Sequence, residues 1–181
     1  MPGPDRSLAA LGLDGVPATD PLSYPGRPAP GPALLTGGAL LPLEVPSAAH
    51  PLGAWPVDEG RPPGAGRRGL DSVLADRGRP GTARRVPVLA VGSNASPGQL
   101  THKLTRAGLD ATVPMVPVRV RGVAVGCSGH ISPPGYVAAA PYLDPAVTTT
   151  LVATWLDPAQ LDAVDATERA HYRRALLPGG R

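Results

Sequence analysis

The residues best suited to chemistry in this 181-residue chain are a Gly92-Ser93-Asn94 turn and a later acid, Glu168. The turn follows a continuous apolar run, residues 87–91, and precedes a helix signal that begins at Pro97. Backbone N–H groups at such a strand-to-helix turn can bind an anion, because the helix dipole favours negative charge there. Taken alone, the turn is more often a bare connection that binds nothing.

The acid lies on the last expected helix of the chain. At about 100° per residue, Leu161, Val164 and Glu168 fall within one narrow arc, so Glu168 faces the core. A carboxylic acid held against apolar surface has its charged form disfavoured and its pKa raised, which suits a general acid/base near neutral pH. The alternative is a helix-end glutamate paired with Arg173 or Arg174.

Signals for the first half of the chain are weak, because most of its 23 glycines and 25 prolines are there. Residues 1–68 are expected to form a Pro/Gly-rich extension, partly irregular, that wraps the domain or stays mobile. Within it, the apolar stretch 33–45 is interrupted by paired glycines and Pro42, which predicts a hairpin or an edge strand. Residues 69–85 are expected to form a short helix, 70–77, closed by Gly78, and a linker.

The second half, residues 86–181, gives consistent signals for one domain. A strand at 87–91 leads to Ser96, whose spacing to Gln99 predicts a capping box, and a helix over 97–107 closed by Gly108. Strands are expected at 116–125, 136–140 and 148–156, the last rich in β-branched residues. Asp157 repeats the cap-and-proline pattern and opens a helix that runs to about residue 169.

The order and separation of these motifs resemble the γ-glutamylcyclotransferase-like superfamily. The match covers roughly residues 86–175: Gly92-Ser93-Asn94, a helix, a three-strand stretch ending at residue 156, then Gln160-Leu161-x-x-Val164-Asp165-x-x-Glu168 and Tyr172-Arg173. The resemblance implies an α+β fold, a small mixed β-barrel with flanking helices. It also implies an internal acyl transfer on a γ-glutamyl amine or related small amide, which releases 5-oxoproline and an amine.

Carried over by position, Gly92, Ser93 and Asn94 would bind the substrate carboxylate, Glu168 would move the proton, and Tyr172 would line the pocket or close the barrel. The chain departs from the family at two neighbouring positions, Val91 and Ala95, where the family usually has Tyr and Leu. It also has only a short tail after the Tyr-Arg segment, so a strand from residues 34–45 would have to complete the barrel.

The segment Cys127-Ser128-Gly129-His130 could be read as a nucleophile pair, but a buried cysteine and a loop histidine are more frequent. We expect His130 to contribute to specificity if its loop faces the pocket. His50, His102 and His171 show no metal-ligand spacing, and no metal or cofactor is expected.

Composition and charge indicate which partners and which cellular location to expect for this chain. The net charge is only +3 and the cations are nearly all arginine without interleaved aromatics, so they are expected to be solvated and no nucleic-acid partner is expected. No apolar run approaches the ~20 residues of a membrane helix, and the amino terminus does not resemble a signal peptide, so the expected location is the cytoplasm. The alternative function is a non-catalytic module that binds a small molecule or a protein.

Overall fold

The computed structural model describes residues 4–61, 66–168 and 172–177, and it confirms the α+β class. None of the described helices is long and apolar enough to cross a membrane. The α-helices are α1 (Leu70–Asp76), α2 (Pro97–Arg106) and α3 (Pro158–Glu168). The strands are β1 (Ala33–Thr36), β2 (Ala39–Pro42), β3 (Pro56–Val57), β4 (Arg68–Gly69), β5 (Val86–Ala90), β6 (Val113–Ile131) and β7 (Val137–Leu156). Short 3-10 turns are η1 (Pro21–Ser23), η2 (Leu52–Ala54), η3 (Thr82–Arg84) and η4 (Ser93–Ala95).

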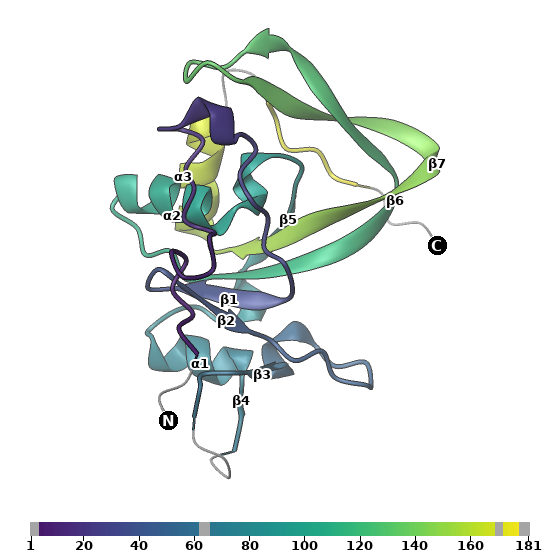
Figure 1. The fold of residues 1–181 in the computed structure, drawn as a ribbon. Helices are drawn as coiled ribbons and strands as arrows, with labels where there is room; N and C mark the ends of the chain where they lie inside the picture. Colours follow the sequence, from purple (N-terminus) through teal and green to yellow (C-terminus); the bar gives the residue numbers. More distant parts are fainter. Residues whose placement is uncertain (1–3, 62–65, 169–171, 178–181) are drawn as a thin grey trace.

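The main sheet has five strands in the order β2-β1-β6-β7-β5, and each neighbouring pair is antiparallel. Figure 1 shows the sheet with α2 and α3 together beside it. The expected mixed β-barrel is wrong for the described residues, because β2 and β5 remain the two edges of an open sheet. Closure requires the edge strands to meet with matched tilt and register, and here short edge strands flank one very long hairpin.

That long hairpin is made by β6 and β7. The strands expected at 136–140 and 148–156 are merged into the single strand β7. Its register skips at Gly122, where Arg121 faces Thr148 but Gly122 faces Asp144. Gly122 has a φ of +83°, a backbone conformation that glycine adopts without a steric penalty. In Figure 1 the hairpin bends sharply, and its far half returns over the carboxyl-terminal segment that follows α3.

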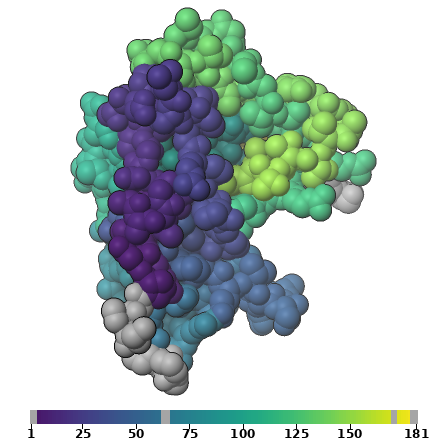
Figure 2. All heavy atoms as spheres, viewed as in Figure 1, coloured from purple at the N-terminus to yellow at the C-terminus, as the bar shows by residue number. Residues whose placement is uncertain are grey.

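The expected hairpin at 33–45 is confirmed as β1 and β2, joined through Gly37 and Gly38 at φ values of 54° and 73°. β1 pairs with β6, so the first half of the chain supplies two strands of the main sheet. The first half also shares a core with the second. The fully or nearly buried residues of this core are Leu8, Leu13, Ala29, Ala33, Leu35, Leu40, Leu100, Leu104, Val113, Met115, Val152, Leu156, Leu161 and Val164. Figure 2 shows the amino-terminal segment lying along the surface of the rest of the molecule.

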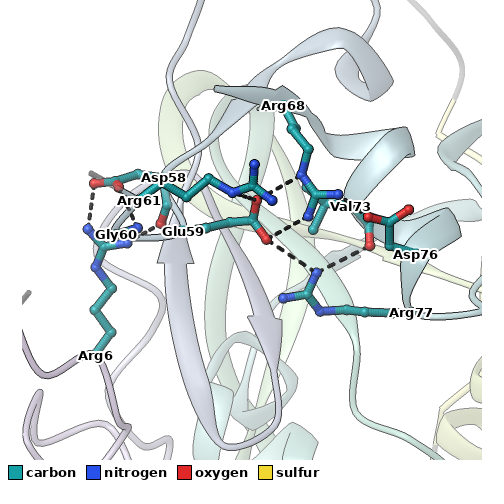
Figure 3. Close-up of polar contacts among 9 residues, drawn as sticks. All are labelled: Arg6, Asp58, Glu59, Gly60, Arg61, Arg68, Val73, Asp76 and Arg77. Carbon is teal, nitrogen blue, oxygen red and sulfur yellow. Dashed lines mark hydrogen bonds and ion pairs between the residues drawn. The ribbon is translucent and has the colours of Figure 1, made fainter. Parts of the chain in front are cut away.

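A second apolar cluster joins α1 to β1 and β3. An ion-pair network links β4 and the end of α1 to the segment after β3 (Figure 3). Helix α1 is followed by Gly78 at a φ of 65°, as expected. In the network, Glu59 accepts two hydrogen bonds from Arg68, of 2.9 and 3.0 Å. The other charged members are Arg6, Asp58, Arg61, Asp76 and Arg77. These arginines are therefore paired with carboxylates rather than simply solvated.

The two expected capping boxes have different outcomes. At α3 the box forms: the N–H of Gln160 donates to Asp157 Oδ1 at 3.0 Å, and the N–H of Asp157 donates to Gln160 Oε1 at 3.1 Å. At α2 the helix begins at Pro97 and is followed by Gly108 at a φ of 71°, as expected. However, neither half of the box forms: the Ser96 side chain makes no cap hydrogen bond, and Gln99 Oε1 accepts from the N–H of Ala18 rather than from that of Ser96.

Candidate functional site

The Gly92-Ser93-Asn94 turn leads into the 3-10 turn η4, whose backbone bonds back on itself. The N–H groups of Ala95 and Ser96 donate to the carbonyls of Gly92 and Ser93 at 3.0 Å each. The start of α2 is covered by the amino-terminal segment, since a Cβ added to Gly98 would lie 2.7 Å from backbone atoms of residues 13–15. The amino-terminal segment therefore covers the start of α2 at Gly98, and the anion site expected at Gly92, Ser93 and Asn94 stays a prediction.

Glu168 and the turn meet, although 74 positions separate them in the sequence. Asn94 Nδ2 donates to Glu168 Oε1 at 3.2 Å. Lys103, on α2, donates from Nζ to the same Glu168 oxygen at 2.6 Å and to Asn94 Oδ1 at 2.8 Å. The three side chains thus form a closed triangle of hydrogen bonds, with Lys103 12% and Glu168 30% exposed.

The expected apolar surroundings of Glu168 are wrong, because its carboxylate is ion-paired. The helical arc itself is confirmed, since Leu161 and Val164 are buried. Neither of the expected arginines is the partner: Arg174 pairs instead with Asp165 at 2.8 Å. α3 packs against α2, so the end of the arc reaches Lys103 before it reaches the core. The predicted end of α3 near residue 169 lies outside the described residues.

Three of the four tyrosines gather beside this triangle. The rings of Tyr24 and Tyr136 stack with centroids 4.1 Å apart and an interplanar angle of 16°. Tyr24 Oη accepts a hydrogen bond of 2.6 Å from the N–H of Ala139, and Tyr172 Oη donates one of 3.1 Å to the Ala139 carbonyl. Strand β7 therefore holds two phenols in place from both sides of one residue.

Burial raises the pKa of Tyr24 and of Tyr136. The charge of Glu168 adds to the rise at both phenols, because a carboxylate nearby disfavours a phenolate. Both hydroxyls therefore stay protonated at neutral pH and can donate to an acceptor. Together with the Lys103–Glu168 pair, they provide one positive group, one negative group and neutral donors in a small region.

His130 lies at this site, with its ring centroid 5.9 Å from that of Tyr172. The Cys127 thiol is exposed, contrary to the expected burial, and Ser128 Oγ donates to the His130 carbonyl at 3.1 Å. All the predicted site residues, namely Gly92, Ser93, Asn94, His130, Glu168 and Tyr172, thus lie in one region. Their proposed roles remain predictions.

Sequence reasoning missed Lys103, Tyr24 and Tyr136. Lys103 is the only lysine in a chain whose other 16 cations are arginines, which was a usable signal. Likewise, the chain has four tyrosines but no phenylalanine, which was a signal that the phenol hydroxyls are used. The position of Tyr24 could not be inferred, because the segment that carries it has no regular structure beyond η1.

Gly92 is required here by close packing against a phenol. An added Cβ would lie 2.6 Å from Tyr24 Oη and 3.4 Å from Ala139 Cβ. We expect Gly92→Ala to lower the unfolding temperature, because the clash with the hydroxyl forces the Tyr24 ring off Tyr136. Adding Tyr24→Phe removes the clashing oxygen and should recover part of the loss in a thermal unfolding series. Simple additivity of the two single variants would contradict this contact.

The chain matches no family model, no curated protein and no solved structure. Among the residues that the structure describes, no three His, Cys, Asp or Glu side chains gather as metal ligands.

Proposed function

We propose that this chain is a γ-glutamylcyclotransferase-like enzyme that acts on a γ-glutamyl amine or a related small amide. The turn at Gly92, Ser93 and Asn94 binds the substrate carboxylate, and Tyr172 and His130 line the same site. Glu168 is the general acid/base. A cytoplasmic location suits a small-molecule enzyme with one cysteine.

The reaction is balanced without a co-reactant. The substrate's α-amino nitrogen attacks its own γ-carbonyl carbon, and Glu168 takes the proton that this nitrogen loses. The amide bond between that carbonyl carbon and the amine nitrogen then breaks, and Glu168 returns the proton to the departing amine. The products are 5-oxoproline and a free amine, and the side chain of Glu168 is again deprotonated at the end.

The observation that carries the proposal is the 3.2 Å hydrogen bond from Asn94 Nδ2 to Glu168 Oε1. This bond joins the two motifs on which the resemblance depends, although they lie 74 positions apart in the sequence. A further support comes from Tyr24. Val91 stands where the family usually has tyrosine, and the Tyr24 hydroxyl packs directly on the neighbouring Gly92.

The test is turnover by the purified full chain. We expect incubation with a panel of γ-glutamyl amides, L-γ-glutamyl ethylamide among them, to yield 5-oxoproline and free amine in equal amounts by mass spectrometry. A parallel incubation without protein corrects for spontaneous cyclisation. If no member of the panel gives product above that background, the enzymatic proposal is wrong.

A second candidate is a binding module without turnover, and one observation favours it. Lys103 Nζ already lies 2.6 Å from Glu168 Oε1, so the carboxylate is occupied by an ion pair before any substrate binds. This candidate predicts that a γ-glutamyl amide binds with a measurable dissociation constant and is recovered intact.

A further inference from the structure

We infer that Lys103 supplies the cation that binds the ligand's carboxylate beside the turn, so that the Lys103–Glu168 pair recognises a zwitterionic α-amino-acid group. The inference rests on the proposed function, since it assigns a residue to the substrate of that site. It adds a charged partner that the Gly92-Ser93-Asn94 turn does not supply.

The first support is the hydrogen-bonding capacity of Lys103. An ammonium has three N–H donors, and the described contacts of Nζ use Asn94 Oδ1 and Glu168 Oε1. The third donor is available to a further acceptor at the same site. A carboxylate is the acceptor that forms the strongest hydrogen bond with an ammonium.

The second support is charge balance. Lys103 and Glu168 carry opposite charges 2.6 Å apart, and the side chain of Lys103 is only 12% exposed. A ligand with only a carboxylate can engage Lys103 but supplies no cation to Glu168 in this partly buried place. An α-amino acid carries both charges on one carbon, so its carboxylate can bind Lys103 while its ammonium binds Glu168.

This arrangement also explains how Glu168 becomes available to react. As the ligand's carboxylate takes a share of Lys103, Glu168 exchanges part of its contact with lysine for a contact with the ligand's ammonium. Glu168 then lies beside the α-amino nitrogen, which loses one proton to water to become the neutral nucleophile and a second to Glu168 as it attacks. A ligand without a carboxylate leaves Lys103 fully engaged with Glu168.

The test uses two ligands that cannot cyclise because they lack the amine: N-ethylglutaramate, with a carboxylate, and N-ethylglutaramide, its neutral carboxamide. By calorimetry on the full chain we expect glutaramate to bind about tenfold to a hundredfold more tightly than glutaramide. Lys103→Gln should abolish this preference, Lys103→Arg should retain part of it, and Glu168→Gln should retain or increase it. Arg106→Gln, an exposed cation on the same helix, is the matched control.

A second measurement keeps the inference falsifiable if Lys103→Gln does not fold. Because Lys103 is the only lysine, acylation of its amine in the wild-type protein can be followed on one peptide by mass spectrometry. We expect glutaramate, but not glutaramide, to slow this acylation at least threefold.

The outcomes separate this inference from the proposed function. A lysine-dependent preference for glutaramate without any 5-oxoproline from L-γ-glutamyl ethylamide supports the carboxylate site and removes the enzyme. Turnover by Lys103→Gln at an unchanged KM, an unchanged preference in that variant, or failure of wild type to prefer glutaramate would overturn the inference.

Discussion

Glu168→Gln is expected to lower kcat for 5-oxoproline formation by about a hundredfold to ten-thousandfold, the usual contribution of a general acid/base. Glutamine keeps the shape of the side chain and can still accept a hydrogen bond from Asn94 Nδ2, so the site's geometry should persist. What is lost is the group that takes a proton from the α-amino nitrogen. The loss should therefore fall on kcat more than on KM.

The matched control is Asp165→Asn, one turn earlier on α3. Asp165 pairs with Arg174 and makes no described contact with Lys103 or Asn94. Its variant should turn over at the wild-type rate. Product formation by Glu168→Gln equal to that of wild type would show that another group moves the proton, even if the reaction itself were correct.

Arg85→Ala is expected to lower the free energy of unfolding by about 3 kcal/mol or more, because several buried acceptors lose their donor at once. Arg85 is 6% exposed, and burial lowers the pKa of its guanidinium. The guanidinium donates to backbone carbonyls of Pro80, Thr112 and Trp155 and to Gln160 Oε1, at 2.9 to 3.1 Å. It therefore joins β7 and the capping box of α3 to the segment before β5.

Arg84→Ala is the control, because Arg84 is the exposed neighbour with the same charge. It should change the unfolding free energy by no more than about 0.5 kcal/mol. Urea unfolding of the two variants measures the difference directly. If both variants changed the unfolding free energy by the same small amount, water would be replacing the Arg85 guanidinium as donor without loss of stability. Arg84 and Arg85 were both expected to be solvated. The burial of Arg85 corrects that expectation.

Where local signals agreed with one another, prediction from sequence was accurate. The strand before Gly92, helix α2 with Gly108, helix α1 with Gly78, and the capping box at Asp157 are all present. These features depend on backbone conformation and on contacts within four residues, which a short stretch of sequence specifies. The capping box at Ser96 failed because a distant segment, at Ala18, competes for Gln99.

The candidate site illustrates the same division. Spacing and helical periodicity brought attention to Asn94 and Glu168, and the contact between them agrees with that reasoning. Lys103 was not anticipated, because its role depends on how α2 packs against α3. The apolar environment expected for Glu168 was replaced by an ion pair for the same reason.

By itself, the sequence determined the class of fold, the strand-to-helix turn at Gly92 and the orientation of Glu168 on its helix, since each follows from side-chain periodicity and local backbone preference. Tertiary structure decided that the sheet stays open, that β1 and β2 join it from the first half, and that Lys103 neutralises Glu168. Those outcomes depend on contacts between segments far apart in the chain, where packing and charge pairing between the segments outweigh local propensity.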